Sequence, residues 1–190
     1  MHETFIQNRS FTGTDFTLAP LVVGEYEACL FEACNFTDTD LSGIKFVDCE
    51  FIGCNLSLAR LHKTSFYDVQ FQECKMLGLR FDTCNEFGLS FSFDQCQLNH
   101  SIFSETTIRR TVFKNSSLQE VDFSEADLTD VVFDHCDLTS AVFDRTTLEK
   151  ADFRTSFNFS INPERNHLRK AKFSLMGLPG LLNQYGIEID

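Results

Sequence analysis

The sequence predicts an all-β solenoid, in which one short backbone unit is repeated along the chain. Large apolar residues recur at every fifth position, a period that neither an α-helix nor a flat β-strand has. Phenylalanine accounts for 22 of the 190 residues, whereas tryptophan is absent and tyrosine occurs three times. One aromatic side chain is therefore used repeatedly at equivalent positions. The first series consists of Phe11, Phe16, Leu21, Tyr26, Phe31, Phe36, Leu41, Phe46, Phe51, Leu56, Leu61, Phe66, Phe71, Met76 and Phe81.

A second series keeps the same period from Phe93 to Phe153 but is displaced by two residues. We therefore expect a net insertion of two residues between Asp82 and Ser92. Gly88 lies in this interval and tolerates backbone dihedrals that other residues avoid. A kink or short bulged loop that the solenoid simply accommodates is the favoured interpretation, and a loop that contacts a partner is the alternative.

Two positions before most large residues lies a small or medium side chain, such as Cys54 or Ala126. Side chains two residues apart in an extended backbone point to the same side, so both are expected to face the core. All eight cysteines occupy this inward position, which favours small core residues over metal ligands or redox centres. Since no C-x-x-C pair and no histidine at ligand spacing accompany them, we expect neither a metal nor a cofactor. The cysteines are Cys29, Cys34, Cys49, Cys54, Cys74, Cys84, Cys96 and Cys136.

The repeats are clearest at residues 126–130 (ADLTD) and 136–140 (CDLTS), which resemble the A(D/N)LXX consensus of the pentapeptide-repeat family. The resemblance covers about residues 4–155 and implies a right-handed quadrilateral β-helix, in which four pentapeptides form each square coil. Residues four repeats apart should then be vertical neighbours, and the sequence agrees. The matching columns are Phe11, Phe31, Phe51 and Phe71, then Phe93, Phe113, Phe133 and Phe153, and finally Leu98, Leu118 and Leu138.

The predicted organisation has three parts. Residues 1–155 form the solenoid, with a break in phase near residues 82–92. Residues 156–175 form a loop and a final partial coil, and residues 176–190 form a short amphipathic helix that ends at Gly186, followed by a terminal strand.

The last part carries a second, shorter resemblance. The tail L-L-x-x-x-G-I-x-I is similar to the C-terminal helix and strand through which the quinolone-resistance Qnr proteins and a mycobacterial relative dimerise, and residues 161–168 (INPERNHL) are similar to a stretch of the microcin immunity protein. The resemblance implies a homodimer. Its junction would be formed by Leu178, Leu181, Leu182, Tyr185, Ile187 and Ile189.

Charge limits the function classes. The formal net charge is −12, from 28 acidic and 16 basic residues, which argues against direct binding of nucleic acid and favours a basic partner surface. The N-terminus has no basic segment followed by an apolar run, and no 18 consecutive apolar residues occur, so we expect a cytoplasmic protein without a membrane span. No nucleophile, base and orienting acid converge in the pattern, so we expect no enzymatic activity.

Acidic residues concentrate between Glu120 and Asp152, where there are ten of them against two basic residues. Part of this count is expected to be structural, because Asp just before the central residue of a repeat forms local backbone hydrogen bonds. The residues in this class are Asp122, Asp127, Asp137 and Asp152. The spacing of four repeats also predicts ion pairs, of Asp130 with Arg110 and Lys150, and of Asp134 with Lys114 and Arg154.

Other carboxylates near Phe123 and Phe143 are expected to keep their charge. Neighbours one coil away from Glu120 and Asp144 are only His100 or serines, so we predict a recognition surface on this face. A solvated face that only maintains solubility is the alternative. The candidate partner-binding residues are Glu105, Glu120, Asp122, Glu125 and Asp144.

In the subgroup that the chain resembles, acidic dimers mimic double-stranded DNA and bind DNA gyrase or topoisomerase IV, which they inhibit or protect from toxins or quinolone-type drugs. The resemblance implies the same class of partner. The sequence lacks the long inserted loop of Qnr proteins, on which drug displacement relies in that group. The alternative function is that of a structural or adaptor solenoid that binds another protein.

Overall fold

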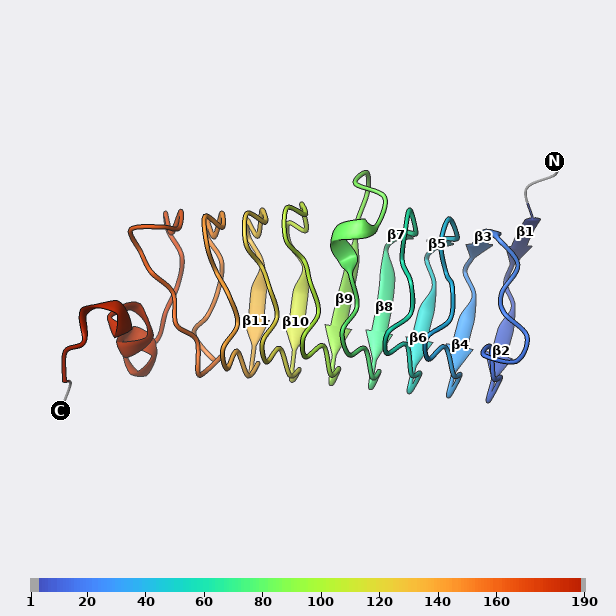
Figure 1. The fold of residues 1–190 in the computed structure, drawn as a ribbon, viewed down its shortest axis with the longest axis horizontal. Helices are drawn as coiled ribbons and strands as arrows, with labels where there is room; N and C mark the ends of the chain where they lie inside the picture. The colour runs from blue at the N-terminus through green and yellow to red at the C-terminus, as the bar shows by residue number, and fades with distance from the viewer. Residues whose placement is uncertain (1–3, 189–190) are drawn as a thin grey trace.

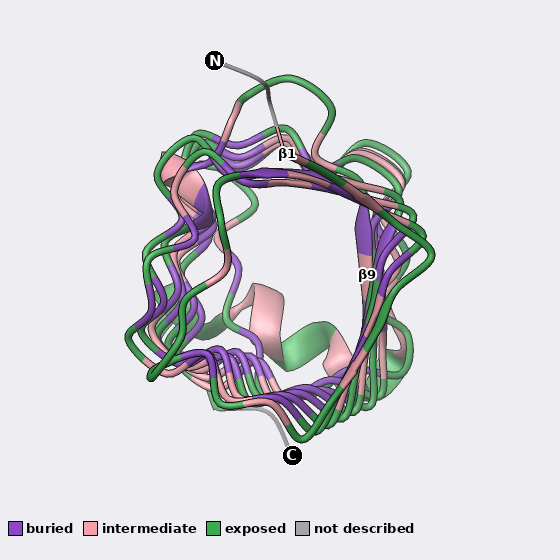
Figure 2. Ribbon diagram, turned by 90° about the vertical axis from the view of Figure 1, so that its right-hand side faces the viewer, coloured by how far each residue is buried: buried purple, intermediate pink, exposed green. Residues whose placement is uncertain are grey.

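The computed structural model describes residues 4–188, which form an elongated rod of stacked, four-sided coils (Figure 1). An end-on view shows the four sides (Figure 2). All strand pairs are parallel, in a four-stranded sheet of order β1-β3-β5-β7 and a seven-stranded sheet of order β11-β10-β9-β8-β6-β4-β2. The predicted all-β solenoid is confirmed. The strands are β1 (Thr4–Gln7), β2 (Ser10–Thr12), β3 (Gly24–Glu27), β4 (Leu30–Glu32), β5 (Lys45–Val47), β6 (Glu50–Ile52), β7 (Ser65–Tyr67), β8 (Val69–Gln72), β9 (Phe91–Asp94), β10 (Val112–Lys114) and β11 (Val132–Asp134).

Strand register confirms the predicted coil of four pentapeptides. Phe31 pairs with Phe51 between β4 and β6, and Phe113 pairs with Phe133 between β10 and β11. The spacing changes once, between β8 and β9, where Val69 pairs with Phe91. The coil between these two strands is longer than the others by two positions, which is the predicted net insertion.

One column of phenylalanine rings continues through the insertion. Successive rings are stacked with centroids 4.6–5.3 Å apart, including Phe71 and Phe93 on either side of the insertion, at 5.3 Å and 9°. Each buried ring removes apolar area from water, which contributes on the order of 1.5–3 kcal/mol. The column therefore joins the two phases of the repeat into one core. Its members are Phe11, Phe31, Phe51, Phe71, Phe93, Phe113, Phe133, Phe153 and Phe173.

Corners of the coils place one residue after another in the left-handed region, two positions after the large residue. Examples are Glu73, Glu105, Glu120 and Lys170, with φ between 54° and 61°. These four side chains are exposed. The left-handed conformation is energetically unfavourable for residues other than glycine. Each corner residue therefore lowers the stability of the rod slightly, and packing of the stacked core offsets this loss.

The cysteines are free and buried at the inward positions, as predicted. The thiol of Cys54 donates a hydrogen bond to the carbonyl of Phe31 in the preceding coil, at 3.2 Å. That of Cys74 donates to the carbonyl of Phe51 at 3.3 Å. Burial raises the pKa of the Cys49 thiol to about 12. Cysteine is therefore a small core residue that also satisfies a backbone carbonyl, a role that the repeat pattern did not indicate.

The phase break contains a short 3-10 helix, η1 (Phe81–Thr83), and a loop at residues 84–90 that projects from the rod between β8 and β9 (Figure 1). The predicted bulged loop is thus confirmed. Gly88 has a φ of 80°, and a Cβ there would lie 2.0 Å from Cε1 of Tyr67. The backbone N–H groups of Asn85 and Ser90 anchor the loop by hydrogen bonds of 2.9 Å to carbonyls of the preceding coil.

The chain after Phe173 turns across the end of the rod in two 3-10 helices, η2 (Leu175–Leu181) and η3 (Asn183–Tyr185). The carbonyl of Gly180 in η2 accepts a hydrogen bond from the N–H of Ile161 at 2.9 Å. A Cβ at Gly180 would lie 2.4 Å from the carbonyl oxygen of Phe159, so η2 packs closely on the last coil. Gly186 ends η3 with a φ of 59°, as predicted for the helix end.

The predicted terminal strand is wrong for the part of the tail that the structure describes. Ile187 and Glu188 belong to no strand, and Ile189 lies outside the described residues. A strand needs a neighbouring edge with which to pair, and η2 occupies the end of the last coil. Pro179 lies within η2, and the helical segments are short 3-10 pieces of the kind found where a regular α-helix is not sustained.

Candidate protein-recognition surface

The five predicted partner-binding residues lie on one side of the rod. Backbone hydrogen bonds from Phe103 to Asp122 at 2.8 Å and from Phe123 to Val142 at 2.9 Å align three consecutive coils on this side. Glu105, Glu120 and Glu125 are exposed at corners, whereas Asp122 and Asp144 are half-buried. We call this set, Glu105, Glu120, Asp122, Glu125 and Asp144, the acidic face.

Two members of the acidic face are neutralised, contrary to the prediction. The guanidinium of Arg145 contacts Glu125 and lies 3.2 Å from Asp144. Arg165 forms a second ion pair with Asp144, at 2.6 Å. Arg145 follows Glu125 by one coil length, so the spacing of four repeats could have revealed that pair. The Arg165 pair was harder to find, because its separation exceeds one coil length by one position and depends on the path of the last coil.

Glu105 and Glu120 form no ion pair with a lysine or an arginine among residues 4–188. Glu120 is 3.3 Å from Nδ1 of His100, the neighbour that the spacing predicted. Glu105 forms no ion pair with any residue in the described range 4–188. The Asp122 carboxylate accepts a hydrogen bond from the N–H of Ser124 at 2.8 Å, the predicted local role. The two exposed glutamates are therefore the strongest candidates for attracting a cationic partner.

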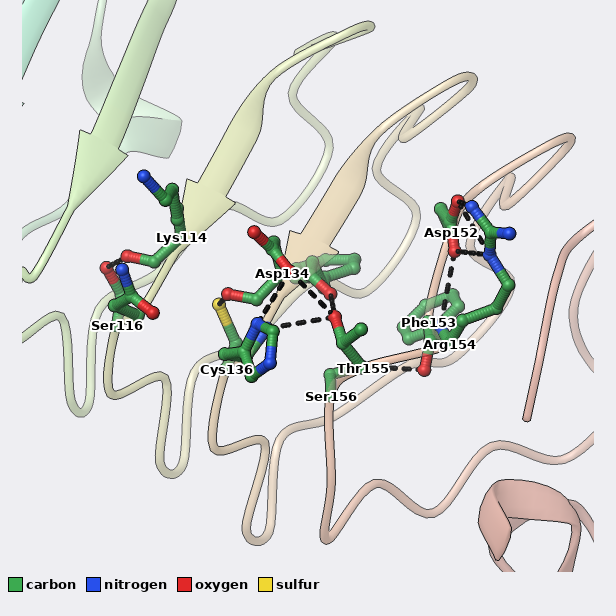
Figure 3. A network of polar contacts seen from close by, with 12 residues as sticks. Lys114, Ser116, Asp134, Cys136, Asp152, Phe153, Arg154, Thr155 and Ser156 are labelled. Carbon is green, nitrogen blue, oxygen red and sulfur yellow. Dashed lines mark hydrogen bonds and ion pairs between the residues drawn. The ribbon is translucent and has the colours of Figure 1, made fainter. Parts of the chain in front are cut away.

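Asp134, on another side of the rod, has partners that differ from the predicted ones (Figure 3). Its carboxylate accepts a hydrogen bond from Oγ1 of Thr155 at 2.9 Å and lies 2.7 Å from Nδ1 of His135. The bond from Thr155, followed by that from His135, lowers the pKa of Asp134. Arg154 is bound by Asp152, at 2.7 Å, which is closer along the backbone. Lys114 pairs instead with Asp94, at 3.3 Å.

The prediction is correct for Asp127 and correct in part for Asp130. Asp127 accepts hydrogen bonds from the N–H and hydroxyl of Thr129 at 3.0 and 2.6 Å. Burial opposes ionisation of Asp127, but the bonds from Arg109 and Thr129 outweigh it and lower its pKa. Of the two ion pairs predicted for Asp130, Lys150 forms one, at 3.7 Å, whereas Arg110 forms none with Asp130. These carboxylates stabilise the coils and offer less free charge to a partner.

The loop at residues 84–90 borders the acidic face and carries an exposed aromatic ring. The Phe87 residue is 78% exposed. A hollow of about 360 Å³ between the loop and the rod is lined by Phe81, Leu89 and Glu105 among others. The sequence analysis did not single out Phe87, although its position outside both five-residue series was a usable signal. An exposed ring beside an unpaired carboxylate is a combination suited to protein recognition.

The C-terminal residues predicted to form a dimer junction are distributed unevenly over the cap. Leu178, Tyr185 and Ile187 are exposed, whereas Leu181 and Leu182 are half-buried. The Tyr185 hydroxyl donates a hydrogen bond to Glu164 at 2.9 Å. Ile189 lies outside the described residues. Three further exposed apolar residues at this end were missed by the sequence analysis, Phe157, Leu175 and Met176.

Two other kinds of feature are missing from the described part of the chain. Within residues 4–188, no group of three or more His, Cys, Asp or Glu side chains is arranged to hold a metal ion. None of the helices in that range combines the length and apolar character needed to cross a membrane.

A family model described as the pentapeptide repeat region matches residues 24–92 and 88–153. The chain belongs to the pentapeptide-repeat family. No curated protein matches this pentapeptide-repeat protein in sequence.

Solved structures match its fold. Full-length QnrB1, a plasmid-mediated fluoroquinolone resistance protein, matches with a TM-score of 0.64 and 14% identity, covering 97% of this chain and 100% of that one. A trypsin-treated form of QnrB1 matches with a TM-score of 0.62 and 20% identity, covering 98% of this chain and 92% of that one. HetL, involved in heterocyst differentiation regulation in the cyanobacterium Nostoc sp., has a TM-score of 0.49 and 17% identity, over 92% and 86% of the two chains. At these identities the two QnrB1 matches concern the fold alone.

Proposed function

We propose that this pentapeptide-repeat protein is a non-enzymatic DNA mimic of the cytoplasm, which binds DNA gyrase or topoisomerase IV and modulates the enzyme or protects it from toxins or quinolone-type drugs. The fold shared with QnrB1 supports this choice, and the distribution of charge along the rod is the observation that carries it.

The linear charge density supports mimicry of a duplex. Residues 84–153 contain 13 acidic and five basic residues, a net charge of −8. At ~4.8 Å per coil, the roughly three and a half coils of this segment extend about 17 Å, or about one net negative charge per 2 Å. Duplex DNA carries one per about 1.7 Å of its axis. A protein groove with cations spaced for DNA would therefore attract this part of the rod by the same long-range force.

The acidic face and the loop supply two different contributions. Glu105 and Glu120 would steer the rod towards cations, because neither is paired with a lysine or an arginine among residues 4–188. Phe87 would add a desolvated contact near them, since buried aromatic anchors account for much of the binding energy in protein interfaces. Because the loop is short, we propose that the rod occupies the DNA groove of the enzyme rather than displacing a bound drug.

A homodimer through the C-terminal cap is part of the proposal. Leu178, Tyr185 and Ile187 leave an exposed apolar set at the end of the rod, which Leu175 and Met176 enlarge. Association of two caps would remove this apolar surface from water and double the length of the acidic rod. Sedimentation analysis that found only a monomer at high protein concentration would contradict this part of the proposal.

Binding of purified gyrase to the full chain tests the function. The double variant Glu105→Lys, Glu120→Lys should weaken binding by at least tenfold and reduce any effect on DNA supercoiling, because attraction becomes repulsion. Asp48→Lys, Glu73→Lys is a matched control in the first half of the rod. All four residues are exposed, have a left-handed φ and undergo the same change of charge.

Equal losses in the two double variants would indicate a general effect of net charge and contradict a recognition surface at the acidic face. If the unaltered protein neither binds gyrase or topoisomerase IV nor changes supercoiling, the topoisomerase proposal fails. The adaptor function is then favoured, and the pairing of Glu125 and Asp144 with arginines is the observation that supports it, because it lowers the free charge of the face.

A further inference from the structure

The last coil of the rod has the opposite charge to the rest. Residues 154–173 contain five basic residues and one acidic residue, a net charge of +4, whereas residues 1–153 carry −14. We call residues 154–173 the basic coil. Its position between the acidic coils and the C-terminal cap gives the rod an electrostatic polarity along its axis (Figure 1). Its basic residues are Arg154, Arg165, Arg169, Lys170 and Lys172.

Only part of this positive charge is used within the molecule. Arg154 and Lys172 both pair with Asp152, at 2.7 and 3.5 Å. In contrast, Arg169 and Lys170 are exposed, and neither forms an ion pair with another residue of the described range. The backbone that carries them is fixed, since the N–H of Lys150 donates to the carbonyl of Arg169 at 2.9 Å. The rod therefore presents two cations, unpaired within residues 4–188, on a rigid corner.

These two cations are too few, and too close to carboxylates, to hold a nucleic acid. Binding of duplex DNA requires the neutralisation of several phosphates. The acidic coils begin one rung of ~4.8 Å away, well within the Debye length of about 8 Å at physiological salt, so they would repel a second polyanion. A pair of carboxylates on a protein surface is a better match, because it needs only local contact with the two side chains.

We propose that Arg169 and Lys170 of the basic coil are a second docking surface, which binds carboxylates of the partner beside the basic groove that takes the acidic face. The inference rests on the proposed function and deepens it. In the proposed homodimer the two basic coils would flank the junction of the caps, between two acidic rods. Carboxylates of the partner opposite each basic coil would therefore fix the position of the rod along the groove, because a shift along its axis brings like charges together.

The direction in which Kd changes when Arg169 and Lys170 are reversed in charge distinguishes two models of binding. If the rod enters a basic groove as a simple polyanion, reversing the two cations should strengthen binding, because it adds negative charge. If the basic coil meets carboxylates, the same change should weaken binding despite the gain in negative charge. The two models thus predict opposite shifts in Kd.

The test uses the full chain with Arg169→Glu, Lys170→Glu and measures the Kd for purified gyrase at low and physiological salt. We expect binding to weaken about tenfold. Lys63→Glu, Lys75→Glu is the control. Both of its lysines are exposed and unpaired among the described residues, lie in the first half of the rod and allow the same change of charge. The control should leave Kd unchanged or lower it. Thermal unfolding of each variant verifies that the rod remains folded.

Unchanged or tighter binding of Arg169→Glu, Lys170→Glu would overturn the inference and leave the proposed function intact, because the unaltered protein still binds. Absence of binding by the unaltered protein would overturn the proposed function itself, and the inference with it. A neutral variant, Arg169→Gln, Lys170→Gln, should give an intermediate loss, and would identify a fold defect of the reversed variant if only the latter fails to bind.

Discussion

The two halves of the rod, residues 4–83 and 91–173, have the same number of residues in each coil but differ in the sides that form β-strands. In the first half, strands occur on two sides, in the sheet of β1, β3, β5 and β7 and in the longer sheet that includes β2, β4, β6 and β8. In the second half only the longer sheet continues, through β9, β10 and β11 (Figure 1). The loop at residues 84–90 separates the two arrangements.

The large residues also differ on the side where the strands are lost. Phe46 and Phe66 stack at 5.6 Å in the four-stranded sheet, whereas the equivalent column after the loop contains Ile108 and Leu128. At Leu128 the backbone makes a turn, with a hydrogen bond of 3.1 Å from Val131 to its carbonyl. The corresponding carbonyl of the first half, at Tyr26, accepts instead the thiol of Cys49 in the next coil, at 3.2 Å.

A second ring column begins on a different side at Phe81, just before the loop, and continues after it through Phe103, Phe123 and Phe143. Phe91 lies between the two arrangements. It occupies an inward position that holds Val69 in the preceding coil, and its ring contacts Phe66 and Phe81 edge-on, at 6.2 and 5.5 Å. The comparison teaches that a five-residue repeat fixes the number of residues in a coil, whereas the large residue alone does not decide between strand and turn. Phe123 lies at a turn, in which Ala126 donates to its carbonyl at 3.1 Å, although Phe113 and Phe133 lie in strands.

Removal of a ring should have the largest effect. Phe123→Ala is expected to reduce the free energy of unfolding by about 3–5 kcal/mol, because the fully buried ring would leave a cavity between Phe103 and Phe143. Phe46→Ala is the matched change in the first half. Urea unfolding of both variants sharpens the comparison. A loss below about 1 kcal/mol in either half would mean that its ring column is not a continuous core.

Rigidity of the loop can be tested at Gly88. Gly88→Ala should cost about 1–3 kcal/mol, since the left-handed φ is unfavourable for alanine and the new Cβ would collide with Tyr67. Gly53→Ala is a control with positive φ but no atom within 4 Å of the added Cβ. Thermal melting distinguishes the two. Equal destabilisation would show that Tyr67 does not confine the loop.

Lowering the pH below 4 should destabilise the second half of the rod more than the first. In the second half the pKa is lowered for four carboxyl groups, Asp127, Asp134, Asp137 and Asp152, and for Asp152 the main cause is the hydrogen bond from Arg154. In the first half the pKa is lowered for two, Asp15 and Asp40. A carboxylate with a depressed folded-state pKa contributes stability above its unfolded pKa of about 3.9, and this is lost as the pH falls through the folded-state value. Hydrogen exchange by segment, corrected for intrinsic rates, should therefore show earlier opening of residues 91–173 below pH 4. Earlier opening of residues 4–83 would reverse the assignment.

Cysteines in the two halves of the rod should be equally unreactive towards a thiol reagent. Burial raises the pKa of Cys49 and Cys136, one in each half, to about 12. The thiolate is the reactive form, so both residues should resist a thiol reagent at pH 8 until the rod is unfolded. Rapid labelling of either one under native conditions would contradict the burial of that half.

The positions of most residues of the acidic face could be predicted from the sequence, but some of their ion pairs and the neighbouring Phe87 could not. The spacing of four repeats placed Glu105, Glu120 and Glu125 on one side of the rod because every coil after the loop has the same length. It failed for Asp144, whose partner Arg165 lies on a coil that the sequence pattern marks only weakly. Phe87 was overlooked because it belongs to neither series of large residues.

The sequence alone determined the period, the phase shift and the columns of the core, because each environment depends only on the position of a residue within a unit of five and on its neighbours one coil away. The tertiary structure decided the ion pairs of Arg145 and Arg154, since long flexible side chains can reach several carboxylates and take the nearest one with suitable geometry. It also decided the form of the cap. Residues after Phe173 do not repeat, so only the shape of the coil beneath them specifies how they fold.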